Sequence, residues 1–296
     1  MRIGVQFPTT EIGTDIAGIR DFAQAAEELG YDHIRILDHV LGADPQQHPE
    51  VPHFAYTRES VIHEPFTLMS FLAALTSRVE LATAIIILPQ RQTALVAKQA
   101  AEVDVLSGGR LRLGIGVGWN PVEYEALGEE WHTRGRRCEE QLDVMRLLWT
   151  QNVVNYSGEW HRISHAGINP LPIQRPIPIW LGAGSSRGPA PPASVMRRIA
   201  RHADGWFPLF PLGDPVKEAI EQVNRHVQEA GRDLTTFGIE VRFILAGKEP
   251  EAWLREAHAW QELGVTHLSV YTSGAQFTSP QQHIDAMRRF KDTMGE

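Results

Sequence analysis

Two strand ends in the sequence carry residue types that can do chemistry. The first is Leu37-Asp-His39, where a carboxylate and an imidazole follow a short apolar run. At the end of a strand such a pair can orient a ligand and move a proton near neutral pH. An ordinary turn that anchors a loop is the alternative. Asp38 and His39 are therefore the candidate catalytic residues.

The second strand end lies in the run from Ser107 to Trp119, where an alternating apolar segment leads into glycines at positions 114, 116 and 118. Glycine there lets a planar or phosphorylated ligand approach the main chain closely. The dinucleotide motif G-x-G-x-x-G fails in both registers, because Trp119 and Pro121 stand where its last glycine belongs. A glycine-rich turn without a ligand is the alternative.

A third candidate is Gly182-Ala-Gly-Ser-Ser186, which follows a predicted strand and precedes a predicted helix. Backbone N–H groups, serine hydroxyls and the helix dipole together suit a phosphate group. The alternative is a turn capped by a serine. We expect Gly182, Ala183, Gly184, Ser185 and Ser186 to bind the phosphate of a cofactor.

Other kinds of site have little support in the sequence. His161 and His165 have the spacing of a metal-binding pair, but they lie in a predicted hairpin, and no cluster of cysteine and histidine occurs, so we expect no metal. No G-x-S-x-G motif occurs, which disfavours a serine hydrolase. Cys138 is the single cysteine, and we expect a structural or exposed position for it.

Short β-branched runs alternate with helical patterns along the whole chain. Strands are predicted at Arg2–Phe7, His33–Leu37, Val79–Leu88, Leu111–Gly116, Ile177–Leu181, Gly205–Phe207, Gly238–Leu245 and Thr266–Val270. Helices are predicted at Asp15–Leu29, Pro65–Thr76, Ala94–Leu106, Trp131–Trp149, Ala193–His202, Pro215–Ala230, Pro250–Leu263 and Pro280–Met294. This alternation predicts the α/β class and a (β/α)8 TIM barrel with loop insertions, built from residues 1–296 as one domain.

Three connections are expected to surround the barrel. The long segment 41–64 and the short segment 209–214 follow strands, so they should form walls of a site at the C-terminal end of the barrel. The segment 151–175 contains a predicted hairpin that turns at Ser157-Gly158. Because that hairpin follows a helix, it is expected at the opposite end.

The composition restricts the partners. A formal net charge of −8 argues against nucleic acid as the main partner. The N-terminal residues show no signal-peptide pattern, and the longest apolar run, Leu81 to Leu88, is far too short to span a bilayer. We therefore expect a cytoplasmic enzyme that acts on a small molecule and has no membrane partner.

Many short phrases, in order, resemble the bacterial luciferase-like superfamily of flavin and deazaflavin enzymes, over nearly the whole chain to about Phe207. The actinobacterial branch that depends on coenzyme F420, a deazaflavin, is the most similar. The phrases are Ala26-Glu-Glu-Leu-Gly30, Asp38-His39, Leu81-Ala-Thr-Ala-Ile-Ile-Ile-Leu-Pro89, Ala97-Lys-Gln-Ala100, Leu106-Ser-Gly-Gly-Arg110, Gly114-Ile-Gly-Val-Gly-Trp119, Arg134-Gly-Arg-Arg137, Pro178-Ile-Trp-Leu-Gly182 and Ala203-Asp-Gly-Trp206.

The resemblance implies a TIM barrel that holds an isoalloxazine-type ring at its C-terminal mouth. Asp38 and His39 would lie beside the ring, with His39 near the face that carries the hydride. The cofactor-binding residues would also include a strand bulge with a non-prolyl cis peptide, the residues that flank the ring or ribityl chain, and the phosphate loop. These are Ala84 and Ile85, Gly116 and Gly118, and residues 182–186.

The sequence departs from the family pattern at two places. Trp119 stands where the sugar-phosphate dehydrogenase branch has an acidic residue that transfers a proton. The inserted Arg187-Gly-Pro-Ala-Pro-Pro192 lengthens the phosphate loop, which leaves open whether Ser185 or Ser186 contacts the phosphate.

These features predict an oxidoreductase that moves a hydride between coenzyme F420 and a small organic substrate. The alternatives are an FMN-dependent monooxygenase that uses oxygen and a cofactor-binding protein without turnover. A homodimer is expected because the superfamily often pairs through helices, and Phe66, Leu68, Phe71 and Leu72 are unusually apolar for one helix. An aromatic substrate pocket is expected at His53, Phe54, Tyr56, His63, Trp119 and Trp206.

Overall fold

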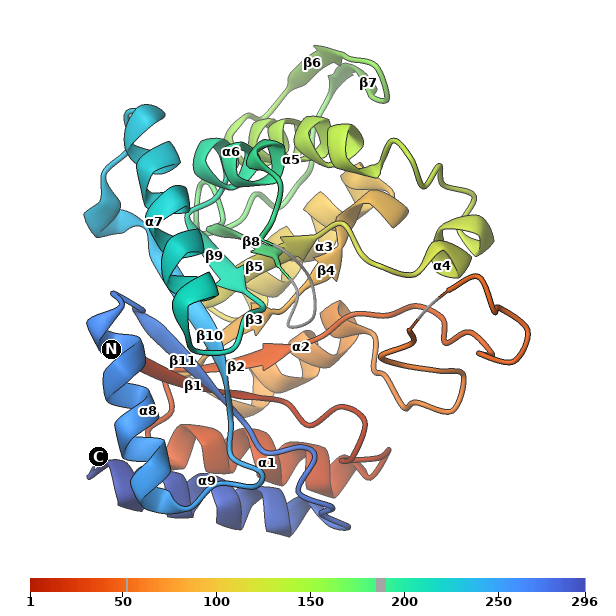
Figure 1. Cartoon of the computed structure of the whole chain (residues 1–296). Coiled ribbons are helices and arrows are strands. Elements are labelled where there is room, and N and C mark those ends of the chain that lie inside the picture. The colour runs from red at the N-terminus through yellow and green to blue at the C-terminus, as the bar shows by residue number, and fades with distance from the viewer. Residues whose placement is uncertain (52, 185–189, 296) are drawn as a thin grey trace.

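Strands and helices alternate along the chain in the computed structural model, which describes residues 1–51, 53–184 and 190–295. Within these residues, the parallel strands β1, β2, β3, β5, β8, β9, β10 and β11 form a closed ring, in which β11 pairs with β1 and β3 pairs with β5 (Figure 1). The strand bounds are β1 Arg2–Gln6, β2 His33–Ile36, β3 Glu80–Thr83, β4 Ile86–Ile87, β5 Leu111–Gly116, β8 Ile179–Ala183, β9 Gly205–Pro208, β10 Gly238–Ile244 and β11 His267–Tyr271. The predicted TIM barrel is confirmed.

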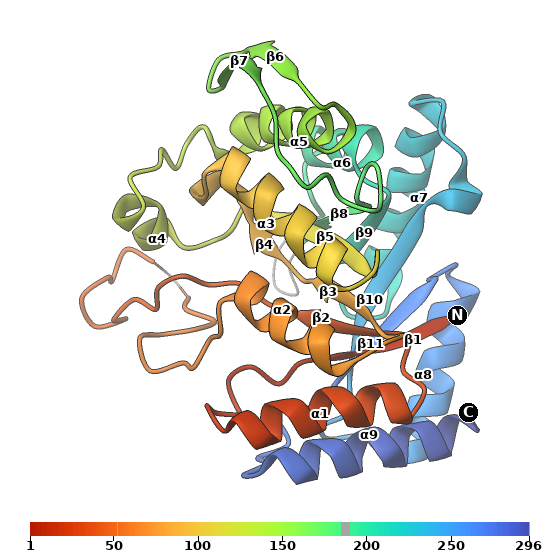
Figure 2. The same ribbon diagram turned by 180° about the vertical axis from the view of Figure 1, so that it is seen from behind.

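Helices cover the outside of the barrel, as the two opposite views show (Figures 1 and 2). The helix bounds are α1 Ile16–Glu28, α2 Pro65–Leu75, α3 Thr93–Leu106, α4 Pro121–Ala126, α5 Arg134–Thr150, α6 Ala193–His202, α7 Asp214–Glu229, α8 Pro250–Glu262 and α9 Pro280–Met294, with short 3-10 helices at Leu88–Gln90 and Leu234–Thr236. Local sequence signals set several of these ends. The Asp15 carboxylate accepts hydrogen bonds from the first backbone N–H groups of α1, and Ser279 forms a capping box with Gln282.

The third predicted strand, Val79–Leu88, is one continuous strand in the sequence analysis and two short ones in the structure. β3 ends at Thr83, and β4 begins at Ile86 after a cis peptide bond between Ala84 and Ile85. The Ala84 N–H still donates to the Ile36 carbonyl, whereas the Ile87 N–H donates to the Asp38 carboxylate instead of a strand. At this bend the Asp38 side chain therefore takes the place of a backbone carbonyl as hydrogen-bond acceptor.

Two further elements differ from the prediction. The helix α4 was not predicted, although Asn120 caps it and Pro121 occupies its first turn. The hairpin consists of β6 (Val154–Ser157) and β7 (Arg162–Ala166), so it turns over residues 158–161, slightly later than predicted.

The hairpin also lies elsewhere than expected. The Nε2 atom of His161 in its turn is 2.5 Å from the Oγ1 atom of Thr93, the first residue of α3. Because α3 follows a barrel strand, Thr93 lies at the C-terminal end of the barrel. The expectation that the hairpin belongs to the opposite end was wrong, because its strands run back along the outside of the helices.

The barrel strands point apolar side chains outward and mostly polar ones inward. On β10, Ile239, Val241 and Phe243 belong to the hydrophobic core under the helices, whereas Glu240 contacts residues from other barrel strands. The two-residue period of a strand requires this alternation, and it also directs Arg242 inward. The interior of this barrel is therefore held together largely by charged and hydrogen-bonded groups.

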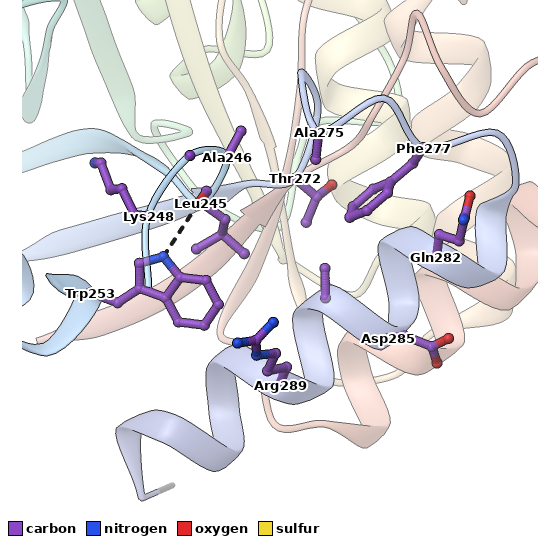
Figure 3. Close-up of a pocket in the computed structure, with 12 residues that line it drawn as sticks. Leu245, Ala246, Lys248, Trp253, Thr272, Ala275, Phe277, Gln282, Asp285 and Arg289 are labelled. Carbon is purple, nitrogen blue, oxygen red and sulfur yellow. Dashed lines mark hydrogen bonds between the residues drawn. The ribbon is translucent and has the colours of Figure 1, made fainter. Parts of the chain in front are cut away.

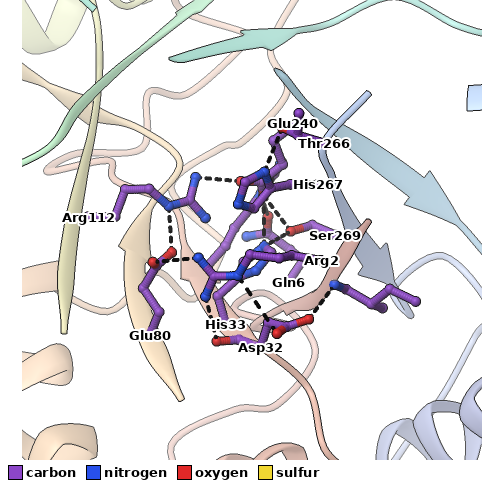
Figure 4. Close-up of polar contacts among 12 residues, drawn as sticks. Arg2, Gln6, Asp32, His33, Glu80, Arg112, Glu240, Thr266, His267 and Ser269 are labelled. Carbon is purple, nitrogen blue, oxygen red and sulfur yellow. Dashed lines mark hydrogen bonds and ion pairs between the residues drawn. The ribbon is translucent and has the colours of Figure 1, made fainter. Parts of the chain in front are cut away.

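Glu240 is the centre of that interior (Figure 4). Its carboxylate is fully buried and lies 2.6 Å from Nη1 of Arg112 and 3.2 Å from Nη1 of Arg35. The hydroxyl of Ser269 donates to the same carboxylate over 2.5 Å, and Nε2 of His33 lies 3.1 Å away. Donors from three strands, β2, β5 and β11, thus surround the carboxylate that β10 carries.

The surroundings keep Glu240 ionised. Burial raises its pKa, but the positive charge of Arg112, the contact with His33 and the charge of Arg35 outweigh burial and bring the pKa well below its usual value of 4.5. A carboxyl with a lowered pKa stabilises the folded state above its ordinary pKa. That contribution is lost as the pH falls from 4.5 toward the lower pKa of the folded state.

We expect Glu240→Gln to lower the free energy of unfolding by about 3–5 kcal/mol, because it leaves buried arginines without their anion. Urea denaturation between pH 7 and pH 3 measures this change. Glu262→Gln, at the exposed end of α8, is the control. The wild type and the control should lose stability below pH 4.5 more steeply than Glu240→Gln does. Equal unfolding midpoints and equal pH dependence in the two variants would contradict the assigned role.

Candidate functional site

A cavity of 490 Å³ opens at the C-terminal end of the barrel. It lies where β4, β5, β8 and β9 end and where α6 begins, and its volume is in the range of small-molecule and cofactor sites. Its lining includes most of the cofactor-binding residues predicted from the sequence, namely Ala84, Ile85, Gly116, Gly118, Gly182, Ala183 and Gly184. The structure therefore brings three distant segments, two of them glycine-rich, to one place.

Two other hollows contain none of the predicted site residues. One of 380 Å³ lies between α8 and α9, beside Trp253, Phe277 and Arg289 (Figure 3). The other, of 1000 Å³, opens at the N-terminal end of the barrel beside Glu80, Arg112 and the neighbouring ion pairs. In TIM barrels that end contributes to stability and the C-terminal end carries the site. The cavity of 490 Å³ is therefore the candidate site.

The Ile85 side chain forms part of the cavity wall, and two glycines make room for it. A Cβ atom on Gly116 would lie 2.6 Å from Cδ1 of Ile85, and one on Gly182 would lie 3.0 Å from its Cγ2. The two glycines therefore leave space for the Ile85 side chain, and it is this side chain that forms the surface open to a ligand. The cis peptide between Ala84 and Ile85, expected from the family resemblance, is present in this wall.

Two other glycines of the wall are required by the backbone itself. Gly118 has a φ of +70° and Gly184 a φ of +117°, which side chains other than glycine rarely adopt. A Cβ on Gly184 would also approach Phe210 to 2.7 Å. Both residues lie where the chain leaves a barrel strand and turns along the cavity.

Asp38 has a supporting position instead of the catalytic one that we predicted. Its carboxylate has no exposed surface, and its Oδ2 atom accepts hydrogen bonds from the Ile87 N–H and from Nε of Arg91. Its Oδ1 atom lies 2.6 Å from Nη2 of Arg91. Burial raises the pKa of Asp38, and the charge of Arg91 opposes that rise. Since both oxygens are occupied, Asp38 fixes the end of β4 and does not line the cavity.

His39 is paired with a residue that the sequence analysis missed. Its Nδ1 atom lies 2.8 Å from Oε2 of Glu123, while Oε1 of Glu123 accepts the N–H groups of Val40 and Leu41 over 2.7 and 3.2 Å. Glu123 is on α4, and its side chain is fully buried. The available signal was an acidic residue in the first turn of a helix that begins with Asn120-Pro121 after the glycine-rich strand.

The charge of Glu123 fixes the tautomer of His39. Burial raises the pKa of Glu123, but the hydrogen bond from His39 and the backbone N–H groups lower it below its usual value, so the group is a carboxylate. A carboxylate accepts a proton from Nδ1 and thereby leaves Nε2 of His39 as the basic atom. Among the described residues, no hydrogen-bond partner occupies Nε2.

Two of the six predicted aromatic pocket residues contact His39, and a third contacts one of these two. The ring centroids of Tyr56 and Trp119 lie 5.0 and 5.4 Å from that of His39, and Phe54 lies 5.8 Å from Trp119. Trp119 also lines the cavity. The loop after β2 thus brings its aromatic residues to the end of β5, as expected for a wall of the site.

The other three lie elsewhere. His53 is exposed, and His63 donates a hydrogen bond to the Gly13 carbonyl, at the edge of Phe7. Trp206 is fully buried in the core outside the barrel, where its Nε1–H donates to the Ala183 carbonyl. Phe207 lines the cavity in its place, because neighbouring residues of β9 point to opposite faces.

The end of the cavity near α6 carries a cation. Arg198 lines it, with its Nε–H donating to Glu139 over 2.9 Å, and its two Nη groups have no hydrogen-bond partner among the described residues. Cys138 borders the same end, and burial raises the pKa of its thiol to about 12, so it stays protonated. Ser185 and Ser186, predicted to bind phosphate, lie outside the described residues.

The described part of the chain holds no group of three metal-ligating side chains and no helix that is long and apolar enough to cross a membrane. What remains is a largely apolar cavity with arginines at two places and a histidine at its edge. Such a lining fits a flat ring with a phosphate-bearing chain better than it fits a metal ion.

This barrel, with a cofactor-sized cavity at its C-terminal end, has the architecture of flavin and deazaflavin oxidoreductases. The chain belongs to the luciferase-like monooxygenase family, whose pattern matches residues 1–294. It is 32% identical to a protein of Mycobacterium tuberculosis over 77% of each chain. It is 30% identical to the FMNH2-dependent dimethylsulfone monooxygenase of Pseudomonas putida, over 80% of this chain and 61% of that one.

The fold also resembles a solved F420-dependent secondary alcohol dehydrogenase in complex with an F420-acetone adduct. The TM-score is 0.78 at 17% sequence identity, over 99% of this chain and 98% of that one. The proteins similar to this chain thus include an F420-dependent enzyme of the same fold and an FMNH2-dependent monooxygenase with related sequence.

We expect Gly116→Ala to lower the free energy of unfolding by about 1–3 kcal/mol, because the new methyl group overlaps with Ile85. The double variant Gly116→Ala with Ile85→Ala should lose less than the sum of the two single variants, since the smaller side chain removes the overlap. Urea denaturation of all three variants measures the coupling. Strictly additive losses would show that the two side chains do not compete for the same space.

Proposed function

We propose that the protein is an oxidoreductase that transfers a hydride between a deazaflavin of the F420 type and a small organic substrate. The observation that carries this proposal is the His39–Glu123 pair, in which His39 packs against the cavity residue Trp119 and its Nε2 atom has no hydrogen-bond partner among the described residues. Hydride transfer to or from a carbon that bears oxygen also moves a proton on that oxygen. A histidine held by a buried carboxylate is suited to take or give that proton.

The residues of the cavity fit such a cofactor. Ile85, Gly116 and Gly182 form an apolar surface for a flat ring, and Arg198 lies where a phosphate needs a cation. When bound, the deazaflavin ring supplies the carbon that accepts or gives the hydride. The chain itself orients the ring, excludes water with apolar side chains, and offers the unprotonated Nε2 of His39 to the proton that leaves the substrate.

The second candidate is an FMN-dependent monooxygenase that uses oxygen. It is favoured by the 30% identity to the FMNH2-dependent dimethylsulfone monooxygenase of Pseudomonas putida. FMN shares the flat ring and the phosphate, so Ile85, the glycines and Arg198 suit it equally well. The two functions differ in whether the reduced ring reacts productively with oxygen.

Fluorescence titration of the purified protein with F420, FMN and riboflavin tests the proposal. We expect F420 to bind more tightly than FMN. Arg198→Gln should weaken both about 10- to 100-fold, because a charge-assisted hydrogen bond to the phosphate is lost. It should leave riboflavin, which has no phosphate, unaffected.

The matched control is Arg197→Gln, an exposed neighbour on α6. Tighter binding of FMN, together with oxygen-dependent turnover, would establish the monooxygenase instead. Binding of a cofactor that no donor reduces would indicate a binding protein without turnover.

His39→Ala should lower turnover by roughly 10²–10⁴-fold if His39 moves the proton. Cofactor affinity should change much less.

Glu123→Gln should change which ring nitrogen of His39 carries the proton. The side-chain carbonyl of the new amide would keep the two backbone N–H groups, so its NH₂ group would donate to Nδ1 of His39 and place the imidazole proton on Nε2.

The ¹⁵N shifts of His39 report this inversion without any substrate or cofactor. Glu125→Gln, exposed on the same helix, is the control and should keep the wild-type tautomer and rate. Full activity in His39→Ala would reduce His39 to a structural role. An unchanged tautomer in Glu123→Gln would exclude the assigned role of Glu123.

Two further features of the proposal come from the sequence. The single cysteine, which can form no internal disulfide, supports a cytoplasmic location. Homodimerisation now has less local support, because Phe66, Leu68 and Leu72 are buried within the chain and only Phe71 of that group is exposed. A dimer face on α2 and α3 would have to use Phe71 and Leu95, and light scattering at micromolar concentration tests it.

A further inference from the structure

Arg242 is a cation in an unusual place. It occupies an inward-facing position of the barrel strand β10, yet its side chain is exposed, so it faces the open mouth of the barrel. Its guanidinium lies over the ring of Tyr271, 5.1 Å from the centroid. Among the described residues, no carboxylate pairs with Arg242 and no hydrogen bond engages its side chain.

The neighbouring charges do not neutralise Arg242. Arg35, in the same mouth, lines the cofactor cavity and shares Glu240 with Arg112. Burial lowers the pKa of Arg35, and the positive charge of Arg242 lowers it further, which reflects two nearby cations. Glu256 borders the same recess as Arg242, but its carboxylate pairs with Lys248. Arg242 therefore presents to solvent a positive charge that no carboxylate of the described residues pairs, in a chain of net charge −8.

Arg242 also lies beside the candidate site. It borders a recess of 160 Å³ together with Leu209, and Leu209 lines the cofactor cavity as well. Tyr56, whose ring is 5.0 Å from that of His39, is close enough to Arg242 and Tyr271 for both to influence the pKa of its hydroxyl, which burial raises. Tyr271 therefore contacts Arg242, and Tyr56 contacts His39.

We propose that Arg242, Tyr56 and Tyr271 bind the carboxylate of the substrate, so that the substrates of this site are small organic carboxylates. A guanidinium binds a carboxylate through two parallel hydrogen bonds, and phenolic hydroxyls donate to the same oxygens. The carboxylate end then lies toward β10 and β11, and the rest of the molecule extends toward His39. The reaction of this carboxylate substrate rests on the proposed function. Binding of the carboxylate to Arg242 needs no cofactor.

Isothermal titration of the cofactor-free protein with benzoate, and with benzamide as the neutral analogue of the same shape, tests the assignment. We expect the wild type to bind benzoate at least about tenfold more tightly than benzamide, because only benzoate gains a charge-assisted hydrogen bond. Arg242→Gln should remove this preference. Arg225→Gln, an exposed arginine on α7, should retain it.

Equal affinities in the wild type would overturn the assignment, whether or not Arg242→Gln folds. A preference that survives in a folded Arg242→Gln would place the anion elsewhere, and tighter binding of inorganic phosphate than of benzoate would replace carboxylates with phosphates. Tyr271→Phe should weaken benzoate and leave benzamide unchanged. Failure of F420 and FMN to bind would refute the proposed function while leaving an Arg242-dependent preference intact.

Discussion

Glu240 is an ionised carboxylate with no access to water, and the inside of the barrel is arranged around it. Removing a carboxylate from water is costly unless cations and hydrogen-bond donors surround it, and here Arg112, Arg35, His33 and Ser269 do so. Each donor comes from a barrel strand, so the anion fixes the relative height of the strands. With these strands fixed, the floor of the cavity above them is fixed as well, because Arg35 belongs to both.

The site above this floor uses carboxylates for support. Asp38 holds the end of β4 and Arg91, and Glu123 holds His39 and the first N–H groups of the following loop. In each case a buried acid replaces the backbone partner that a regular strand would provide. The result is a site in which the glycines and Ile85 shape an apolar wall, while His39 keeps one nitrogen free.

Two arginines lie at different places of the candidate site, and each suits a different ligand. Arg198, on α6, has two Nη groups without a hydrogen-bond partner among the described residues at the end of the cavity, whereas Arg242 faces the mouth from β10. The first suits a cofactor phosphate and the second a substrate carboxylate. His39 lies between these regions, next to Trp119 of the cavity and Tyr56 of the loop. One barrel end thereby separates cofactor binding from substrate recognition.

The sequence alone determined the barrel, the glycine-rich wall and the aromatic loop, because these depend on local periodicity and on residues that permit unusual backbone conformations. It did not determine which of Trp206 and Phe207 faces the cavity, since a four-residue strand of apolar side chains has no pattern and only pairing with its neighbours sets its face. Nor did it show that Glu123 holds His39 from 84 residues away, or that no carboxylate of the described residues pairs with Arg242. Contacts of this kind exist only after the barrel closes, because closure brings distant strand ends together.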